Sequence, residues 1–405
     1  MCSSDLKDCE FKANHVSRII YVNGNNQAQR WKIHHSKFTM INNGDGIYGS
    51  QISFWEFHHN EVDLNGCRRG VYTINLNNAQ NKWYNNILYG AVANGTSYAA
   101  LSFPASNYEN HVYHNTLVVS TATGSALYSQ GWSSGINRFH DNIVVVIGGG
   151  NCIKVYYATG GSANLGMYTA DNNIYFAPGG NIGYWDTGYP TLPAWRTAVA
   201  AYNAAGDTNS IDAAPMLVSM AAPFDLHLTS TSPAIDKALY TPSYITDDFE
   251  GTPRGAKADI GAYERKGTGF FAYGQGCPGS GSLVPAIGHT GTVALGSTSF
   301  AVTAGNALGG APALLALGAS NASWLGIPEA LALGGGCNIY QAIALAFAFG
   351  LSGSGPGGGA VSVPLAIPNN PALAGASLYL QWLIVDPAAP NGFGVVTTQG
   401  AQVIF

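Results

Sequence analysis

Charged side chains are scarce in this chain of 405 residues: Lys, Arg, Asp and Glu make up 10% of it, and the formal net charge is −5. A protein that binds nucleic acid carries a basic face, so this composition predicts no nucleic-acid partner. A membrane-spanning helix needs a run of about 18 or more apolar residues. The longest candidate, AIALAFAFGL, is too short, and we expect no transmembrane segment.

Sequence motifs for metal binding are also missing. The chain contains neither a CxxC nor an HExxH pattern, so the sequence assigns no metal ligands. Of its six cysteines, we expect Cys9, Cys67 and Cys152 to be free and buried, because they fall at different places in different repeats. Cys277 and Cys337 either form a disulfide, which suits an oxidising compartment, or remain two free thiols.

What the chain does contain is a repeated six-residue phrase: apolar, any, polar, Asn, any, apolar. FHHNEV (57–62) and WYNNIL (83–88) are two copies, and successive copies are 22 to 31 residues apart. A second phrase, a small residue followed by an apolar one, recurs downstream, as in Gly46-Ile47 and Gly70-Val71. The fourth position of the first phrase is held in turn by Asn14, Ser36, Asn60, Asn86, Asn115, Asn142 and Asn173.

This repeat predicts a solenoid of stacked coils. Short alternating apolar pieces are half-buried strands, and a period of roughly 20 to 30 residues is typical of a stacked repeat architecture. Asn tolerates the left-handed backbone of a sharp corner, and stacked Asn side chains can form a hydrogen-bonded ladder. We therefore predict an all-β fold: a right-handed parallel β-helix with three strands per rung and an Asn ladder.

The first six residues, MCSSDL, do not read as a signal peptide, because no apolar stretch follows. They resemble the in-frame translation of GTG-TGC-TCT-TCC-GAT-CT, the end of a common sequencing adapter, with GTG as the start codon. We therefore expect residues 1–6 to be a library artefact, with further rungs, a cap and a signal peptide upstream. The alternative is a genuine start without a leader.

Composition changes sharply near residue 266. No Lys or Arg follows Lys266, and the only later acids are Glu329 and Asp386. We predict a truncated β-helix over 7–265, a linker over 266–280 and a C-terminal domain over 281–405. Alternating pieces such as TSFAVTAG and ASLYLQWLIVD predict a small antiparallel β-sandwich for that domain.

The end of the first domain carries the most specific resemblance. The stretches FDLHLTSTSPAID (224–236) and DDFEGTPRGAKADIGAYE (247–264) resemble the closing coils of bacterial extracellular pectin-lyase-like β-helix proteins, sometimes called a choice-of-anchor Q tail. The resemblance implies secretion. The segment after GQGCPG resembles an uncharacterised C-terminal domain of large secreted bacterial proteins. For Asp247, Arg254, Asp259 and Glu264 we favour a buried ion-pair lock over an active site.

Residues at the same position of successive coils stack into a column on one face. Two such columns of the predicted coils contain side chains that could bind a ligand or catalyse a reaction. The first precedes the Asn corner and is rich in His and Asp. It could bind a metal or transfer protons, although a structural polar ladder is the favoured interpretation. Its members are His34, His35, His58, His59, His114, His140, Asp141 and Asp171.

The second column follows the small-apolar phrase and contains Tyr48, Tyr72, Ser102, Tyr128, Lys154 and Tyr184, with Asp45 and Arg69 just before the same strand. Outward aromatic rings can stack on sugar faces. By resemblance to lyases of this fold, Lys154 or Tyr128 would be the catalytic base and Arg69 the partner of a uronate carboxylate. Asp45, Tyr48, Tyr72 and Tyr184 would then bind substrate. Ordinary strand surface is the alternative interpretation.

Three functions remain open from the sequence. The first is a secreted protein that binds or cleaves polysaccharide along its stacked strands, as a lyase rather than a hydrolase, since no Asp cluster lies in the column. The second is a non-catalytic glycan-binding or adhesive cell-surface protein that is attached through its C-terminal domain, an anchoring or sorting module. The third is a structural spacer. No cofactor is assigned. Ca²⁺ is a candidate through the lyase resemblance, although the carboxylate cluster of those enzymes is missing. The expected location is extracellular or on the cell surface.

Overall fold

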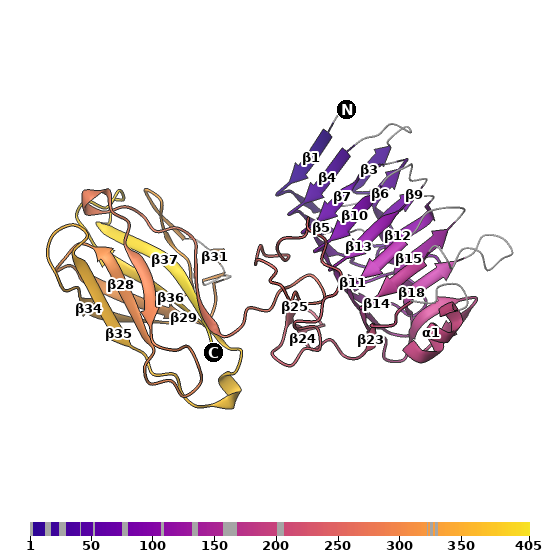
Figure 1. The fold of residues 1–405 in the computed structure, drawn as a ribbon. Coiled ribbons are helices and arrows are strands. Elements are labelled where there is room, and N and C mark those ends of the chain that lie inside the picture. The colour runs from indigo at the N-terminus through magenta and orange to yellow at the C-terminus, as the bar shows by residue number, and fades with distance from the viewer. Residues whose placement is uncertain are drawn as a thin grey trace. The chain divides into compact units, whose positions relative to one another are not determined.

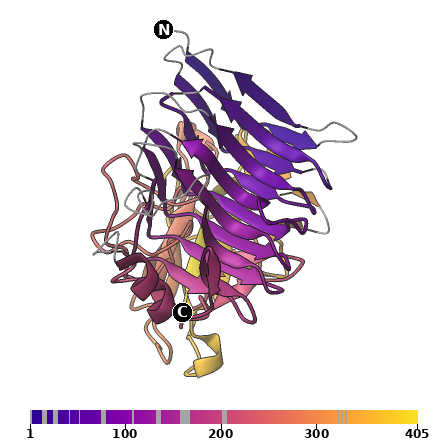
Figure 2. The ribbon, with the colours of Figure 1, turned by 90° about the vertical axis from the view of Figure 1, so that its right-hand side faces the viewer.

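The computed structural model describes residues 3–12, 18–23, 30–40, 42–51, 53–74, 80–106, 109–131, 137–156, 168–200, 206–321, 323–324, 327–328 and 331–405. The chain divides into two compact units, Met1–Arg265 and Lys266–Phe405. The first is a parallel β-helix, as predicted: each rung contributes one strand to each of three parallel sheets. Figures 1 and 2 show these strands stacked from the N-terminal rung to the rung beside α1 (Leu192–Ala200).

The three sheets are named A, B and C in the order in which a rung visits them. Sheet A contains β1 (Ser3–Lys7), β4 (Arg30–His34), β7 (Glu56–His58), β10 (Asn81–Tyr84), β13 (Asn110–Tyr113), β16 (Asn137–His140) and β19 (Tyr168–Asp171). Sheet B contains β2 (Glu10–Lys12), β5 (Lys37–Thr39), β8 (Glu61–Asp63), β11 (Ile87–Ala91), β14 (Thr116–Ser120), β17 (Ile143–Ile147), β20 (Ile174–Phe176) and β23 (Ile211–Asp212). Sheet C contains β3 (Ile20–Asn23), β6 (Asp45–Ser50), β9 (Arg69–Ile74), β12 (Ala99–Ser106), β15 (Ser125–Gly131), β18 (Asn151–Tyr156), β21 (Asn181–Trp185) and an antiparallel final strand, β22 (Thr187–Tyr189).

Apolar side chains of the three sheets fill the inside of the coil. One inward column of sheet A runs Ile33, Phe57, Trp83, Val112 and Phe139, and all five are buried. A rung cannot cover these side chains by itself, so each rung depends on its neighbours for burial. In the last rung of sheet C the inward position is Gly183, and the indole of Trp195 from α1 (Leu192–Ala200) occupies the space beside it.

The Asn ladder lies buried at the corner between sheets A and B. The Oδ1 atom of each ladder Asn accepts from the backbone N–H of the ladder residue one rung earlier, at 2.9 to 3.1 Å along the series. Each Asn Nδ2 also donates to a backbone carbonyl of sheet A. Serines stand at both ends, and the series is Ser36, Asn60, Asn86, Asn115, Asn142, Asn173 and Ser210.

Two details of the predicted ladder need correction. Asn14 lies outside the described residues, and the register of β2 with β5 puts Cys9, not Asn14, opposite Ser36. The repeat therefore begins earlier than the phrase FKANHV suggested, because Phe11 pairs with Phe38 of sheet B and not with Ile33 of sheet A. The predicted artefact 1–6 overlaps β1, which pairs along its whole length with β4.

The left-handed backbone at each corner does not belong to the ladder Asn, as the sequence had suggested. The residue with positive φ is the one before the ladder Asn, since the ladder side chain itself must point inward beneath the turn. These corner residues are His35, His59, Asn85, His114, Asp141 and Asn172, with φ from 51° to 55°. Asn, Asp and His are the non-glycine residues that adopt this conformation most readily.

The tail after α1 packs on the outer face of sheet B. Apolar side chains of that face, including Val118 and Val145, form a second core with Leu226, Ile260 and Tyr263 of the tail. The tail contains one small hairpin, β24 (Leu217–Ser219) and β25 (Asp225–Leu228). The conspicuous DIGAYE motif thus has a packing role, because it lies against the coils and closes one face of them.

The second unit consists of antiparallel sheets, as predicted. A five-stranded sheet has the order β26 (Gly269–Tyr273), β37 (Val395–Ile404), β36 (Ser377–Val385), β29 (Pro312–Gly318) and β34 (Leu345–Gly350). A three-stranded sheet contains β27 (Ala286–Thr290), β28 (Ala301–Ala307) and β35 (Gly359–Pro364), and both sheets contribute to one core. Short pairs are β30 (Ser323–Trp324) with β31 (Ile327–Pro328), and β32 (Leu331–Gly334) with β33 (Cys337–Ile339).

Residues 266–280 were expected to be a linker, but they include β26, which pairs with β37 and so belongs to the five-stranded sheet. Cys277 and Cys337 form a disulfide. In the first unit Cys67 and Cys152 are free and buried, whereas Cys9 is partly exposed.

Candidate functional site

The outward column of sheet C brings the predicted substrate-binding residues into one line. The strand register pairs Tyr48 with Tyr72, Tyr72 with Ser102, and Tyr128 with Lys154. Tyr21, which the sequence interpretation missed, precedes them. Its signal was present, because Ile20-Tyr21 has the same apolar-Tyr pattern as Ile47-Tyr48 and Val71-Tyr72 and lies one repeat earlier.

Three tyrosine rings at the N-terminal end of this column form a continuous surface, which we call the tyrosine ladder (Tyr21, Tyr48 and Tyr72). The ring centroids of Tyr21 and Tyr48 are 5.3 Å apart, and those of Tyr48 and Tyr72 are 5.0 Å apart. The guanidinium of Arg18 lies 4.0 Å from the Tyr48 ring centroid. Burial raises the pKa of both Tyr48 and Tyr72, so their hydroxyls stay protonated near neutral pH.

Asp45 and Arg69, predicted as site residues, bind each other. Nε of Arg69 donates to Oδ1 of Asp45 at 2.9 Å, and Nη2 donates to Oδ2 at 3.2 Å. The same guanidinium lies 4.1 Å from the ring centroid of Tyr72. Because the carboxylate of Asp45 already neutralises Arg69, this arginine is poorly suited to neutralise a uronate carboxylate as well.

The predicted base candidates lie further along the same column. Tyr128 and Lys154 are each only 5% exposed. Burial lowers the pKa of the Lys154 ammonium, which favours a role as a base. Its Nζ atom lies 4.3 Å from the ring centroid of Tyr184, on the next strand and away from Arg69.

The base and the carboxylate partner expected for a lyase do not meet. Arg69 is on β9 and Lys154 on β18, with β12 and β15 between them. Neighbouring strands lie about 4.8 Å apart, so the two residues are separated by roughly 14 Å along the sheet. A lyase removes a proton next to the carboxylate it neutralises, and both groups must reach one sugar residue. This pair spans more than one sugar.

The His and Asp column of the sequence separates into two groups. Toward the C-terminal rungs the tail covers it: Asp141 accepts from the backbone N–H groups of Leu239 and Tyr240, and the Tyr240 hydroxyl donates to Asp171. His114 contacts the Thr241 hydroxyl at 3.0 Å. These members are buried structural partners of the tail, which agrees with the favoured polar-ladder interpretation.

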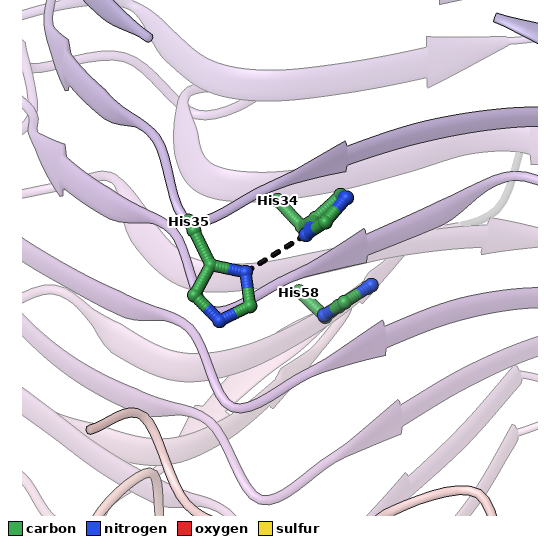
Figure 3. Close-up of side chains that lie close together, drawn as sticks. All are labelled: His34, His35 and His58. Carbon is green, nitrogen blue, oxygen red and sulfur yellow. Dashed lines mark hydrogen bonds between the residues drawn. The ribbon is translucent and has the colours of Figure 1, made fainter. Parts of the chain in front are cut away.

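The first four histidines of that column instead form an array at the corner between sheets A and B, and Figure 3 shows His34, His35 and His58 of this array. The rings of His34 and His58 stack with centroids 4.7 Å apart, as do those of His35 and His59. Within each rung the two Nδ1 atoms face each other, at 2.8 Å for His34 and His35 and 2.7 Å for His58 and His59. We call these four residues the histidine array.

Carboxylates and a cleft border the histidine array. Nε2 of His34 lies 2.9 Å from Oδ1 of Asp5, and Nε2 of His59 lies 3.2 Å from Oδ1 of Asp247. Burial lowers the pKa of His58 to about 2 and that of His59 to about 4, so both rings are neutral at neutral pH. A cleft of about 550 Å³ opens beside them, and its lining includes His35, His59, Lys37, Glu61 and Phe249.

Comparison with known proteins gives no further guide to function, since no protein-family model matches the chain and no curated protein does. No helix in the part of the chain that the structure describes has the length and hydropathy of a membrane span.

Proposed function

We propose that this protein binds an anionic polysaccharide on the tyrosine ladder of sheet C, without cleaving it. The observation that supports this most is the line of Tyr21, Tyr48 and Tyr72, whose rings succeed one another at 5.0 to 5.3 Å. Aromatic rings offer flat apolar surface to sugar faces while their hydroxyls remain hydrogen-bond donors. A chain laid along the helix axis would meet one ring per rung.

The charges beside the ladder favour an acidic glycan. Arg18 is exposed over the Tyr48 ring, and Arg68 and Arg69 lie on the rung of Tyr72. Asp45 is the acidic partner of both Arg68, at 3.7 Å, and Arg69, at 2.9 Å. One carboxylate against three guanidinium groups leaves this end of sheet C positive, although the chain as a whole is negative. Uronate or sulfate groups of a glycan would complement it.

Binding is preferred to lyase chemistry because of the separation between Arg69 and Lys154. The lowered pKa of Lys154 is the one feature that supports a base. The bidentate contact of Arg69 with Asp45 and the burial of Lys154 both argue against a shared substrate. An extracellular location is part of the proposal, and the disulfide between Cys277 and Cys337 supports it, since such bonds persist in oxidising compartments.

The proposal is tested by binding to polygalacturonate, alginate and a neutral glucan, measured by affinity electrophoresis and calorimetry. We expect both acidic polymers to bind more tightly than the glucan. Arg18→Gln should weaken acidic binding several-fold, and Tyr48→Ala should weaken it by about tenfold, the order expected for losing one aromatic contact of 1–1.5 kcal/mol. Phe393→Ala, which removes the exposed aromatic ring of another unit, is the matched control.

The same samples decide between binding and cleavage. Absorbance of unsaturated uronates reports a lyase, and new reducing ends report a hydrolase. We expect neither signal. Cleavage that disappears in Lys154→Ala would replace the binding proposal with a lyase, and equal affinity of wild type and Tyr48→Ala for every polymer would refute the tyrosine ladder as the site.

A further inference from the structure

The histidine array carries an inference that is independent of glycan binding. Among the described residues, one group of three or more His, Cys, Asp or Glu side chains comes close enough to hold a metal ion: His34, His35 and His58, whose ligand atoms all lie within 4.8 Å of one another. We propose that these three imidazoles bind a first-row divalent transition-metal ion, with Zn²⁺ as the representative ion.

The distances suit such an ion. Zinc bonds to imidazole nitrogen at about 2.1 Å, so two nitrogens on one tetrahedral ion lie about 3.4 Å apart. The structure has 2.8 Å between the Nδ1 atoms of His34 and His35, and the remaining separations among the three reach no further than 4.8 Å. Small ring rotations would therefore bring the three nitrogens to bonding distance. The rings of His34 and His58 are stacked and His35 meets both edge-on, so the rings must turn about their side-chain bonds until their lone pairs converge on the ion (Figure 3).

The hydrogen bonds around His34 prepare it as a ligand. Asp5 lies 2.9 Å from Nε2 of His34, and a carboxylate at that distance favours the tautomer with the proton on Nε2. The Nδ1 atom of His34 then carries a lone pair and accepts from Nδ1–H of His35 across 2.8 Å. A metal ion placed between them takes the position of that proton, and His35 can carry its own proton on Nε2 instead. Metal-ligating histidines commonly have such a carboxylate partner.

The surroundings of the three histidines let an ion enter from solvent, and their ligand atoms favour a transition metal over Ca²⁺. His35 is exposed and lines the cleft of about 550 Å³, so an ion and a completing water can enter from solvent. Three nitrogen ligands favour zinc, copper or nickel, whereas Ca²⁺ takes six to eight oxygens. The Ca²⁺ considered from the sequence is therefore a poor match for this cluster. None of the three ligands lies in residues 1–6, whereas Asp5, the hydrogen-bond partner of His34, does.

The fold itself supplies conservative substitutions for the test. In the register of sheet A, the position of His34 and His58 is held by Tyr84 and Tyr113 in the next two rungs. The corner position of His35 is held elsewhere by Asn85 and Asn172, with the same positive φ. His34→Tyr and His35→Asn thus keep the ring stack and the left-handed corner while they remove a ligand.

The full chain is titrated with Zn²⁺ in a calorimeter, and the metal retained after dialysis is measured separately. We expect about one ion per chain, at least tenfold weaker binding in His34→Tyr, in His35→Asn and in His58→Tyr, and unchanged binding in His289→Gln, which removes an exposed histidine elsewhere. Visible absorbance of bound Co²⁺ gives a second readout of nitrogen coordination, and Ca²⁺ should not compete.

Each alternative outcome is decisive. Failure of the wild-type chain to retain Zn²⁺, or equal retention by His34→Tyr and His35→Asn, overturns the proposal. An equal loss in His289→Gln would mean scattered surface binding and would overturn it too. Circular dichroism checks folding, and His35→Asn, at an exposed corner that accepts Asn in other rungs, keeps the test valid if a change at His58 disturbs the stack.

Discussion

Nη1 of Arg254 donates to Oε2 of Glu264 at 2.9 Å, in a site where the arginine side chain is 1% exposed and the glutamate 11%. The other donors of Arg254 are also occupied. Nη1 and Nη2 reach the carbonyls of Asp259 and Gly261, Nε reaches that of Asp247, and Nη2 reaches Oδ1 of Asn85 in the coil. This one guanidinium therefore ties the closing motif of the tail to a corner of the β-helix.

Arg254→Ala should destabilise the first unit strongly. Removing one partner of a buried ion pair typically costs 3–5 kcal/mol, because the other charge is left buried and unpaired. For a unit of this size that corresponds to a midpoint lower by roughly 10 °C, measured by circular dichroism during heating. Arg138→Gln removes an ion pair with Glu109 whose side chains are about one-third exposed, and it should lower the midpoint by no more than about 2 °C.

The double variant Arg254→Met with Glu264→Gln separates charge from packing. Without a buried carboxylate to leave unpaired, the double variant should be more stable than Arg254→Ala. If instead the single arginine variant melts with the wild type, the ion-pair interpretation of the tail is wrong.

Asn115 gives the corresponding prediction for the ladder. Its side chain is fully buried, it donates to the carbonyls of Trp83 and Tyr113, and it accepts from the backbone N–H of Asn86. Asn115→Ala leaves several of these groups without partners, and each buried unpaired group costs about 1–3 kcal/mol. We expect a loss of about 3 kcal/mol or more, seen as a lower midpoint of thermal unfolding.

Asn115→Ser is the graded control for that change. Ser36 and Ser210 already occupy the two ends of the ladder, where a hydroxyl accepts from a backbone N–H. A serine at position 115 keeps one acceptor but cannot span to the carbonyls, so its stability should fall between those of wild type and the alanine variant. Equal midpoints for all three proteins would show that the ladder contributes little.

The coil architecture was predictable because the repeated residues are the ones that face the inside of the coil or stand at its corners. Asn60, Asn86 and Asn115 recur together with neighbouring apolar residues. Burial restricts which residue types can occupy either kind of position, so the pattern repeats in the sequence. The phrase FKANHV has the right pattern without the right partner, because Phe11 pairs with Phe38 and Cys9 lies opposite Ser36. A six-residue pattern does not encode which sheet a residue joins, and only the strand register resolves it.

The disulfide of the second unit yields a prediction of a different kind. Cys277 and Cys337 are 60 residues apart. Closing a loop of that length restricts the unfolded chain by roughly 4 kcal/mol in the chain-entropy model. Cys277→Ser with Cys337→Ser should therefore lower the unfolding midpoint of the second unit while leaving that of the first unchanged. Addition of a reductant should reproduce the shift, and a shift confined to the first unit would contradict the assignment.

For the candidate site, the sequence predicted which residues share a column but not which side chains contact one another. Tyr48, Tyr72, Tyr128 and Lys154 share an outward position because the strand period is two, and that could be read directly. The ion pair between Asp45 and Arg69 could not be read from the sequence, because it depends on side-chain rotamers and on the distance between rungs. The doubled histidines at 34–35 and 58–59 were visible in the sequence, whereas the cover that the tail places over His114 and Asp141 was not.

His227 supplies the prediction for pH. It lies in β25, with Nδ1 2.6 Å from Oδ1 of Asp225 and Nε2 3.1 Å from Oε1 of Glu250. Burial acts to lower the pKa of His227, but the hydrogen bonds and charges of Glu250 and Asp225 together outweigh it and raise that pKa to about 9. The folded state therefore holds this proton more tightly than the unfolded chain, whose histidine titrates near about 6.5.

The sign of the effect follows from that difference. Below about pH 6.5 both states are protonated and the stabilisation by His227 is fully present; it is lost as the pH rises through about 9. Because the side chain is 46% exposed, solvent screening limits the contribution to about 0.5–1 kcal/mol. The midpoint difference between wild type and His227→Gln should thus be largest near pH 6 and vanish near pH 10. His289→Gln should show no such trend, and a difference that grew with pH would mean that His227 is neutral in the fold and that its carboxylate neighbours do not hold it charged.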